Sequence, residues 1–376
     1  MGTNNEYQIS PIEMGVTLIS LIFGVGILTL PRALANRVGT TDGWISILIA
    51  GLISMVLIYF YTRLQQNFPN EGLLQYLAKG KVGKWGAKAF AFLFIFYFTN
   101  LLALQARLLA MAVKMYLIDR TPSEVIVAII LLVTTYAASK GIQGIIHIHL
   151  MFMPFILFAL FIVIIFNLAE ADFNRLSPIL SEGFVPVLSG IFSPMFSFVG
   201  IFFLFFFMTY MKASDLRSLP LNIAMMFLII TYTFLTIISY AVFGFEMSKV
   251  ITFPAIELAK EIEIIGKFIE RLESIFLTIY IMAIFTTMAT VLFTNYKVIN
   301  EQFLPNNKNR KWVPPVIIFI IFIVTFIPDS INSLKKLGEF IAILGDSLLG
   351  AGIAIGYMTV WLRKRRKTSY DNVSQT

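Results

Sequence analysis

Ten stretches of mostly apolar residues follow one another along the chain. A helix that spans a membrane needs about 20 such residues. This rule predicts ten spans, at residues 10–34, 42–62, 85–116, 124–139, 145–168, 190–211, 218–243, 270–296, 312–328 and 337–361. The third and eighth are the longest, and the fourth and ninth are short. The pattern predicts an all-α polytopic membrane protein with a single integral membrane domain over residues 1–376.

The first span is interrupted by Gly24 and Gly26, which are one residue apart. In lipid every backbone N–H and C=O must find a partner, so a broken span is tolerated only against protein or a watery cavity. Broken helices place free backbone groups and half-helix dipoles at mid-membrane, where small solutes and ions bind. We therefore expect Gly24 and Gly26 to border a ligand site. The alternative is that they only allow helices to pack closely.

The sixth span also has an irregular centre. Ser193-Pro194 is followed by Phe198-Val199-Gly200, so this helix is predicted to be broken as well. Paired broken helices at the first and sixth positions are typical of an inverted repeat of five plus five spans. The first repeat would cover residues 10–168 and the second residues 190–361, with a basic tail at 362–376. The glycine at position 200 has the same two interpretations, site or packing.

The eighth span carries a row of hydroxyl side chains on one helical face. Together with Ala283, its members recur at intervals of three and four residues, and Thr286 lies beside them: Tyr280, Thr287, Thr290 and Thr294. Hydroxyls in this arrangement can line a solute pocket or help to coordinate a cation, so Thr286 and Thr290 are candidate ion or coupling residues. The alternative is that each threonine bonds back to its own helix without any functional role.

A few polar residues lie inside the other predicted spans. Ionisable residues in a membrane are functional candidates by default. Arg107 is close enough to a span end to extend its charge to the interface. Asp346 is shorter, and could pair with Arg107, titrate or coordinate an ion. Tyr97 and Gln105 in the third span need partners and are expected to face the interior of the bundle.

Composition narrows the function further. Hydrophobic residues make up 58% of the chain and charged residues 13%, against about 25% in soluble domains. The net charge of +8 does not indicate nucleic-acid binding, because much of it lies in short loops and in the tail. This distribution predicts that both termini are cytoplasmic. The absence of cysteine excludes thiolate metal sites, and no catalytic motif is present, so no enzyme, metal or cofactor is expected.

Two further features carry weaker expectations. The two histidines, His147 and His149, fall at the inner start of the fifth span, where an interfacial position is the simplest interpretation and a metal or proton-relay role is the alternative. Residues 254–271 form an amphipathic stretch outside the spans, which we expect to be a helix on the outer surface. It could be a solvated connection, a lid or a docking element.

The N-terminal region resembles a known family. The run Gly24-Val25-Gly26-Ile27-Leu28-Thr29-Leu30-Pro31-Arg32, preceded by Ile9-Ser10-Pro11 in a chain of ten predicted spans, is similar to the B subunits of spore germinant receptors. This family is a branch of the amino acid–polyamine–organocation transporter superfamily. The resemblance implies a leucine-transporter-like fold in the inner membrane of bacterial spores. It also implies a subunit that binds a small nutrient and acts with an A subunit and a C subunit to start germination.

The resemblance also implies a ligand site. Carried over by position, the site would comprise Gly24, Val25, Gly26, Val199, Gly200 and Thr287, with Tyr97 approaching from the third span. Relatives often have an acidic residue two positions after the sixth-span glycine, where this chain has Phe202. An apolar site suits an apolar amino acid. The alternative function is a secondary amino acid transporter coupled to a proton or a cation, because sensors and transporters share this scaffold.

Overall fold

The computed structural model describes residues 7–373 except residue 80, residues 263–271 and residues 306–311. Every regular element in this part of the chain is a helix. The α-helices are α1 (Pro11–Ile22), α2 (Val25–Val38), α3 (Gly43–Gln65), α4 (Leu73–Leu77), α5 (Lys81–Tyr116), α6 (Ser123–Ser139), α7 (Gly141–Asn167), α8 (Val185–Gly190), α9 (Phe192–Ser197), α10 (Leu204–Phe207), α11 (Ser218–Phe243), α12 (Phe245–Val250), α13 (Pro254–Lys260), α14 (Leu272–Gln302), α15 (Val313–Thr325) and α16 (Ile331–Val373). The 3₁₀ helices are η1 (Phe173–Leu176), η2 (Phe198–Phe203), η3 (Met208–Tyr210) and η4 (Ala213–Asp215).

Many of these helices are long and apolar enough to cross a membrane. In the described residues seven segments qualify singly, and α1 with α2 would make an eighth as a bent pair. Two apolar helices, α6 and α15, are shorter, at 17 and 13 residues. The predicted class of helical membrane protein is confirmed.

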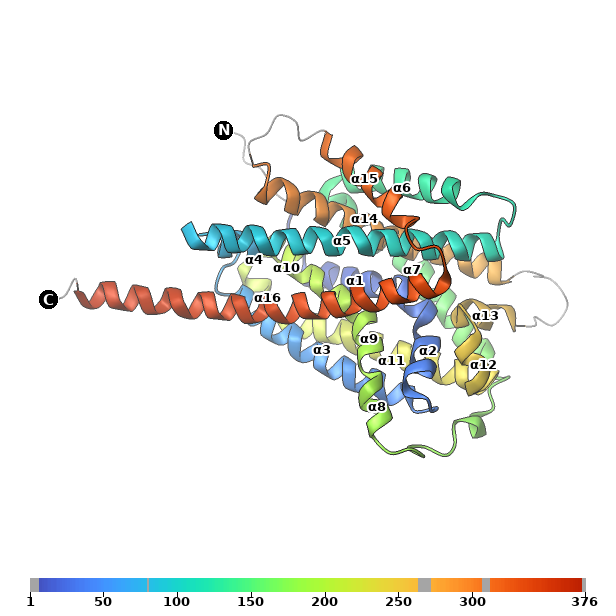
Figure 1. The fold of residues 1–376 in the computed structure, drawn as a ribbon. Helices are drawn as coiled ribbons and strands as arrows, with labels where there is room; N and C mark the ends of the chain where they lie inside the picture. Colours follow the sequence, from blue (N-terminus) through green and yellow to red (C-terminus); the bar gives the residue numbers. More distant parts are fainter. Residues whose placement is uncertain (1–6, 80, 263–271, 306–311, 374–376) are drawn as a thin grey trace.

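The long helices lie side by side along one direction (Figure 1). α14 packs against α5 and α7, α3 packs against α11, and α1 contacts α7, α11 and α14. The C-terminal part of α16 projects beyond its neighbours at the left-hand end of the view, where α4 also lies. The short helices α12 and α13 lie at the opposite end. α1 therefore sits inside the bundle, where helices from both halves of the chain surround it.

Local sequence explains how the first helices begin and end. Ser10 and Glu13 form a capping box at the start of α1: the Ser10 N–H donates to the Glu13 carboxylate at 2.8 Å, and the Glu13 N–H donates to Ser10 Oγ at 3.3 Å. Pro11 at the first helical position fits this start. α2 ends at Gly39, which has a left-handed φ of 78°. These signals fix the two ends of the first span.

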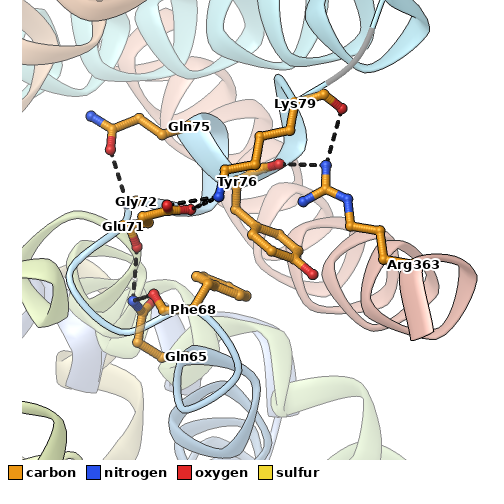
Figure 2. Close-up of polar contacts among 8 residues, drawn as sticks. All are labelled: Gln65, Phe68, Glu71, Gly72, Gln75, Tyr76, Lys79 and Arg363. Atoms are coloured by element: carbon orange, nitrogen blue, oxygen red, sulfur yellow. Dashed lines mark hydrogen bonds and ion pairs between the residues drawn. The ribbon is translucent and has the colours of Figure 1, made fainter. Parts of the chain in front are cut away.

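α4 holds the projecting helix α16 at the left-hand end of the molecule. Figure 2 shows Arg363 of α16 donating to the carbonyls of Tyr76, at 2.7 Å, and Lys79, at 3.1 Å. The guanidinium carbon lies 4.1 Å from the centre of the Tyr76 ring. On the other side of α4, Gln65 of α3 donates to the carbonyl of Glu71 at 2.8 Å. The connection between α3 and α5 is thereby tied to both α3 and α16.

The amphipathic stretch after α12 is placed differently from the prediction. A helix forms, as expected, at α13, but most of its residues are buried rather than exposed on a surface. It packs against α2 and α14, and the Tyr116 hydroxyl donates to Glu257 at 2.6 Å. The alternation of charge and apolar residues could not reveal this burial, because the charged side chains also find partners. Residues 263–271 of the predicted stretch lie outside the described residues.

Candidate functional site

The first span bends between α1 and α2. The two helix axes differ by 53°, and Phe23 and Gly24 lie between the helices without α-helical structure. Both residues are buried. The carbonyls of the last turn of α1 therefore lack their helical partners in the interior of the protein, where an unpaired carbonyl is costly.

Side chains from two other helices satisfy these carbonyls. Tyr232 of α11 donates its hydroxyl to the carbonyl of Ile22 at 2.7 Å. Tyr280 of α14 lies within hydrogen-bond reach of the carbonyls of Phe23 and Gly24. The hydroxyl of Thr287 lies 3.4 Å from the Leu21 carbonyl and 3.0 Å from the Ala283 carbonyl of its own helix. The bend is thus a built feature, held by hydroxyl groups.

The sixth predicted span lies against this bend. It runs through α8, α9, η2, α10 and η3, and it changes from α-helix to 3₁₀ helix at Phe198. A Cβ atom added at Gly200 would lie 2.6 Å from Ile22 Cγ1, and one at Gly26 would lie 3.0 Å from Ser197 Cβ. Both glycines therefore allow backbone segments to approach closely. The packing interpretation of Gly200 and Gly26 holds alongside the site interpretation.

A cavity of about 40 Å³ lies between the bend, η2, α5 and α14. A cavity needs some 10–15 Å³ for one water molecule, so this space admits only a few. Five of the predicted ligand residues line it together: Gly24, Gly26, Val199, Gly200 and Thr287. The remaining lining residues are mostly apolar: Leu21, Ile22, Leu101, Leu104, Gln105, Phe196, Ser197 and Phe203.

Gln105 and Ser197 are polar residues of this cavity that the predicted site left out, and Gln105 is the longer of the two. Gln105 is the one with an unmet hydrogen-bonding need among the described residues. It is 6% exposed, and its Oε1 atom has no hydrogen-bond partner within the described part of the chain. A buried acceptor without a donor is unfavourable by about 1–3 kcal/mol. The sequence signal was present, because a glutamine in a membrane span needs a partner. The sequence could not show that it faces the glycine break.

The other two predicted ligand residues are placed apart from this lining. Val25 begins α2, and the structure does not describe its side chain. Tyr97 packs its ring 5.2 Å from that of Phe202, outside the cavity lining. A Cβ added at Gly345 of α16 would lie 2.9 Å from both the Tyr97 ring and Val199. Tyr97 therefore contributes to the site only indirectly, by packing near Val199 and Gly345 of α16.

The candidate coupling residues fall into two separate places. Asp346 follows Gly345 on α16 and is half-buried, on the side of Tyr97. Arg107 lies over the ring of Phe326, at 5.0 Å, and no ion pair joins it to Asp346 among the residues the structure describes. Thr286 and Thr290 lie on α14, on the face toward α1 and α7.

The interfacial position expected for His149 is wrong. Its side chain is fully buried, with Nδ1 2.7 Å from Ser20 Oγ and Nε2 2.8 Å from Thr290 Oγ1. Ser20 Oγ also lies 3.5 Å from Thr286 Oγ1. The apolar pattern of α7 could not show which of its faces meets a polar helix. Ser20, His149, Thr286 and Thr290 are called the polar bridge below.

Phe202, two positions after Gly200, belongs to an aromatic cluster. Its ring lies 4.7 Å from Phe94, 5.2 Å from Tyr97 and 5.5 Å from Phe98. The cluster joins η2 to α5 on one side of the cavity. A carboxylate here would be buried among aromatic rings, so the apolar residue fits the packing of this chain.

A second cavity, of about 190 Å³, lies near α4. Its polar lining includes Gln75, Thr209, Lys297 and Glu301, and it contains none of the predicted site residues. Across the described residues, no group of three or more His, Asp or Glu side chains is placed to hold a metal ion. The cavity at the bend is therefore the better candidate for the predicted site.

Comparison with known proteins gives the following matches. The family model described as "Spore germination protein" matches residues 8–334. Spore germination protein GerLB of Bacillus cereus is 29% identical over 346 residues, which are 90% of each chain. Spore germination protein YndE of Bacillus subtilis is 26% identical over 365 residues, covering 96% of this chain and 98% of that protein. Spore germination protein A2 of Bacillus subtilis is 28% identical over 336 residues, covering 89% of this chain and 91% of that protein.

Solved structures of transporters share the fold. A nucleobase-cation-symport-1 family transporter, in a closed conformation with bromovinylhydantoin bound, has a TM-score of 0.70 at 12% identity, covering 96% of this chain and 80% of that one. A Na⁺-coupled sialic acid symporter, substrate-bound and outward-open, has a TM-score of 0.66 at 12% identity, covering 94% and 81%. At this identity the likeness concerns the fold alone, and it shows a transporter-like helical fold.

Proposed function

Since the chain belongs to the spore germination protein family, we propose that it is the nutrient-sensing B subunit of a spore germinant receptor. The resemblance noted in the sequence is confirmed by this family membership, and the chain is an integral membrane protein rather than an enzyme. In the proposed role, a small nutrient binds in the cavity at the bend of the first span. Binding is then transmitted to an A subunit and a C subunit, and germination follows.

The observation that carries this proposal is the cavity itself. It joins a broken backbone, an apolar wall and the buried acceptor Gln105 Oε1, which has no hydrogen-bond partner among the described residues. Gln105 Oε1 can accept from the ammonium group of an amino acid. The first backbone N–H groups of α2 can receive its carboxylate, as helix N-termini receive anions. The wall of Leu21, Leu101 and Leu104 suits an apolar side chain, so we expect an apolar amino acid.

Ligand binding must be linked to a change of shape. The cavity of about 40 Å³ holds a few water molecules and is too small for an amino acid. The protein must therefore widen to admit the nutrient. A ligand shifts an equilibrium only when its affinity differs between two conformations. A nutrient that binds only to the widened form of the protein meets this condition.

We further propose a ten-span topology for the whole chain. The eight longer spans, counting α1 with α2 as one, together with α6 and α15 give ten. They would form a single domain of two inverted repeats, about 10–168 and 190–361, in the leucine-transporter-like arrangement. Both termini would be cytoplasmic, and the protein would reside in the inner membrane of the spore. The basic segment Arg363-Lys364-Arg365 supports this orientation.

The second candidate function is secondary amino acid transport coupled to a proton or a cation. The transporter-like fold favours it, as does the polar bridge beside the cavity. Proteoliposomes that contain this chain alone separate the two functions. Uptake of a labelled amino acid would support a transporter, whereas no uptake together with a requirement for partner subunits in spores would support a sensor.

The experiment that tests the sensor proposal is deletion of the gene from a spore former. Release of dipicolinate is measured across a panel of amino acids, sugars and nucleosides. The proposal predicts selective loss of the response to one nutrient class, restored by the intact gene. Unchanged responses in spores whose other receptor operons are also deleted would contradict it.

A further inference from the structure

A buried histidine bridges three helices beside the candidate ligand cavity. His149 of α7 contacts Ser20 of α1 through Nδ1, at 2.7 Å, and Thr290 of α14 through Nε2, at 2.8 Å. All three side chains are fully buried. A neutral imidazole has one nitrogen that donates and one that accepts. The surrounding hydrogen bonds therefore decide which nitrogen carries the proton.

The network fixes the protonated nitrogen. The Thr290 hydroxyl donates to the carbonyl of Thr286 at 3.0 Å, so its oxygen is left to accept from His149 Nε2–H. Nδ1 then carries no proton and accepts from the Ser20 hydroxyl. In this arrangement a neutral ring satisfies both of its nitrogens. A second proton would have to enter at Nδ1, where Ser20 would then have to stop donating.

We propose that His149 is a proton-binding residue, and that its protonation releases α1 from α14 and opens the cavity. This inference rests on the proposed ligand-binding role of the cavity and assigns the coupled ion as a proton. Protonation at Nδ1 turns Ser20 from donor to acceptor and places a charge in the polar bridge. The closed packing of α1 against α14 holds only while the ring is neutral.

Among the described residues, no opposite charge is placed to compensate that proton. α1, α6, α11, α13 and α14 pack against α7, and no hydrogen bond or ion pair joins His149 to a charged group among the described residues. α11 itself contains no charged residue, and Arg217 directly precedes it. The described charged side chains on the other elements are Glu13 on α1, Glu124 on α6, Glu257 and Lys260 on α13, and Lys297 and Glu301 on α14.

Glu13 and Lys297 are the closest of these charges along the chain to Ser20 and Thr290, and each of them has another partner. Glu13 accepts from Tyr7, and Lys297 lies 3.9 Å from Glu301. A buried charge without a partner is strongly unfavourable, so the protonated ring requires water. Water reaches it only if α1 moves away, which is the opening step.

The polar bridge is joined directly to the cavity. Ser20 precedes Leu21, and Thr286 precedes Thr287; Leu21 and Thr287 both line the cavity. Thr287 Oγ1 also lies 3.4 Å from the Leu21 carbonyl. A movement of α1 away from α14 must therefore widen the cavity, and a ligand that widens it must expose His149. Linkage makes this effect reciprocal between proton and ligand.

The size of the pH effect follows from the proposal. A water-exposed imidazole has a pKa near 6.5. If the open form binds the proton and the closed form does not, the open-to-closed ratio rises about tenfold from pH 7.5 to pH 5.5. The sign is fixed, because the form that binds more protons gains population as pH falls.

Cysteine accessibility measures this opening without any nutrient. The chain has no cysteine, so the full-length protein in nanodiscs can carry S197C, whose position lines the cavity, or S214C, whose position is exposed. A water-soluble maleimide labels both, and the S197C rate divided by the S214C rate removes the pH dependence of the thiol itself. We expect this ratio to rise about tenfold from pH 7.5 to pH 5.5, as the imidazole pKa requires.

The two histidines supply the matched variants. H149Q keeps a neutral amide that can accept from Ser20 and donate to Thr290, and it should make the ratio independent of pH. H147Q should leave the pH dependence unchanged. In H147Q the sole histidine is His149, and ¹⁵N-histidine NMR should find the neutral ring protonated on Nε2 at pH 7.5. This second readout does not depend on the folding of H149Q.

Three results would overturn the inference: a ratio independent of pH in the unsubstituted background, the same pH dependence in folded H149Q, or a ring protonated on Nδ1 at pH 7.5. Because no nutrient is present, these results leave nutrient binding in the cavity untouched. Conversely, a chain that binds no nutrient can still open with protonation, so the two proposals fail separately.

Discussion

Tyr280 illustrates how single side chains stabilise the bend of the first span. Its buried hydroxyl lies within hydrogen-bond reach of two carbonyls at the break, those of Phe23 and Gly24. The Phe23 carbonyl lies outside both helices, whereas Gly24 is the N-cap of α2 and its carbonyl also accepts the first hydrogen bond of that helix. In Y280F they would lose this donor while the ring is kept, which costs about 1–3 kcal/mol when a buried acceptor is left unpaired.

We therefore expect Y280F to lower the free energy of unfolding by about 1–3 kcal/mol. Unfolding in mixed micelles titrated with sodium dodecyl sulfate measures it. Y296F is the matched control, because Tyr296 is half-buried on the same helix and its hydroxyl makes no hydrogen bond within the described residues. A loss in Y280F no larger than in Y296F would show that the hydroxyl does not hold the bend.

Gly26 lines the cavity, but a substitution there is a poor test of ligand binding. A Cβ at this position already lies 3.0 Å from Ser197 Cβ, so a tryptophan would push α2 and α9 apart. Such a variant confuses lost packing with lost binding. Gln105 separates the two, because its side chain lines the cavity and its replacement adds no Cβ atom where a glycine stands.

At the scale of elements, α4 clamps the projecting helix α16. Arg363 donates to two carbonyls near the end of α4 and stacks on Tyr76. Arginine suits this site because its planar group both stacks and donates in several directions. Hydrogen bonds that involve a charged group contribute about 1.5–3 kcal/mol.

R363A should therefore release α4. Amide hydrogen exchange in residues 73–79 should become about tenfold faster, since a tenfold change corresponds to about 1.4 kcal/mol of local opening free energy. R365A is the control, because Arg365 stacks on Trp361 of its own helix. Equal exchange in R363A and the unsubstituted protein would mean that other contacts hold α4.

The sequence predicts where the helices lie along the chain better than it predicts which segments they contact. Each predicted span coincides with a helix or helical series, because about 20 apolar residues leave the chain few alternatives in a membrane. The 3₁₀ geometry of η2 was not predicted. It accompanies the close approach of Gly200 to Ile22, a contact between segments far apart in the sequence.

The site was predicted only in part for the same reason. Glycine weakens a helix through a property of its own backbone. Local sequence was therefore enough to single out Gly24, Gly26 and Gly200. The partners of the break could not, because Tyr232, Gln105 and His149 lie on other helices. Their importance depends on which helical face meets which neighbour, and an apolar pattern around a whole helix leaves that open.

At the scale of the whole molecule, we propose a two-state sensor. The closed form has a small cavity, a neutral polar bridge and α1 packed between α7, α11 and α14. The widened form would admit a nutrient and water together. Partner subunits would detect the difference through elements that move with α1. Ligand and proton would then act on the same equilibrium.

The nutrient dose response of spores that carry Q105L tests directly whether a nutrient binds in the cavity at the bend. Strains lacking the native copy are complemented with the unsubstituted gene, Q105L or N100L, and dipicolinate release is followed with matched protein levels in the spore membrane. N100L is the control, because Asn100 lies on α5 outside the cavity lining and donates to the Phe96 carbonyl of its own helix.

The account predicts that Q105L raises the nutrient concentration for half-maximal release about tenfold, the loss of one hydrogen bond to a charged ligand group. N100L should respond like the unsubstituted protein. A normal dose response in Q105L spores, at normal protein level, would contradict nutrient binding in the cavity at the bend.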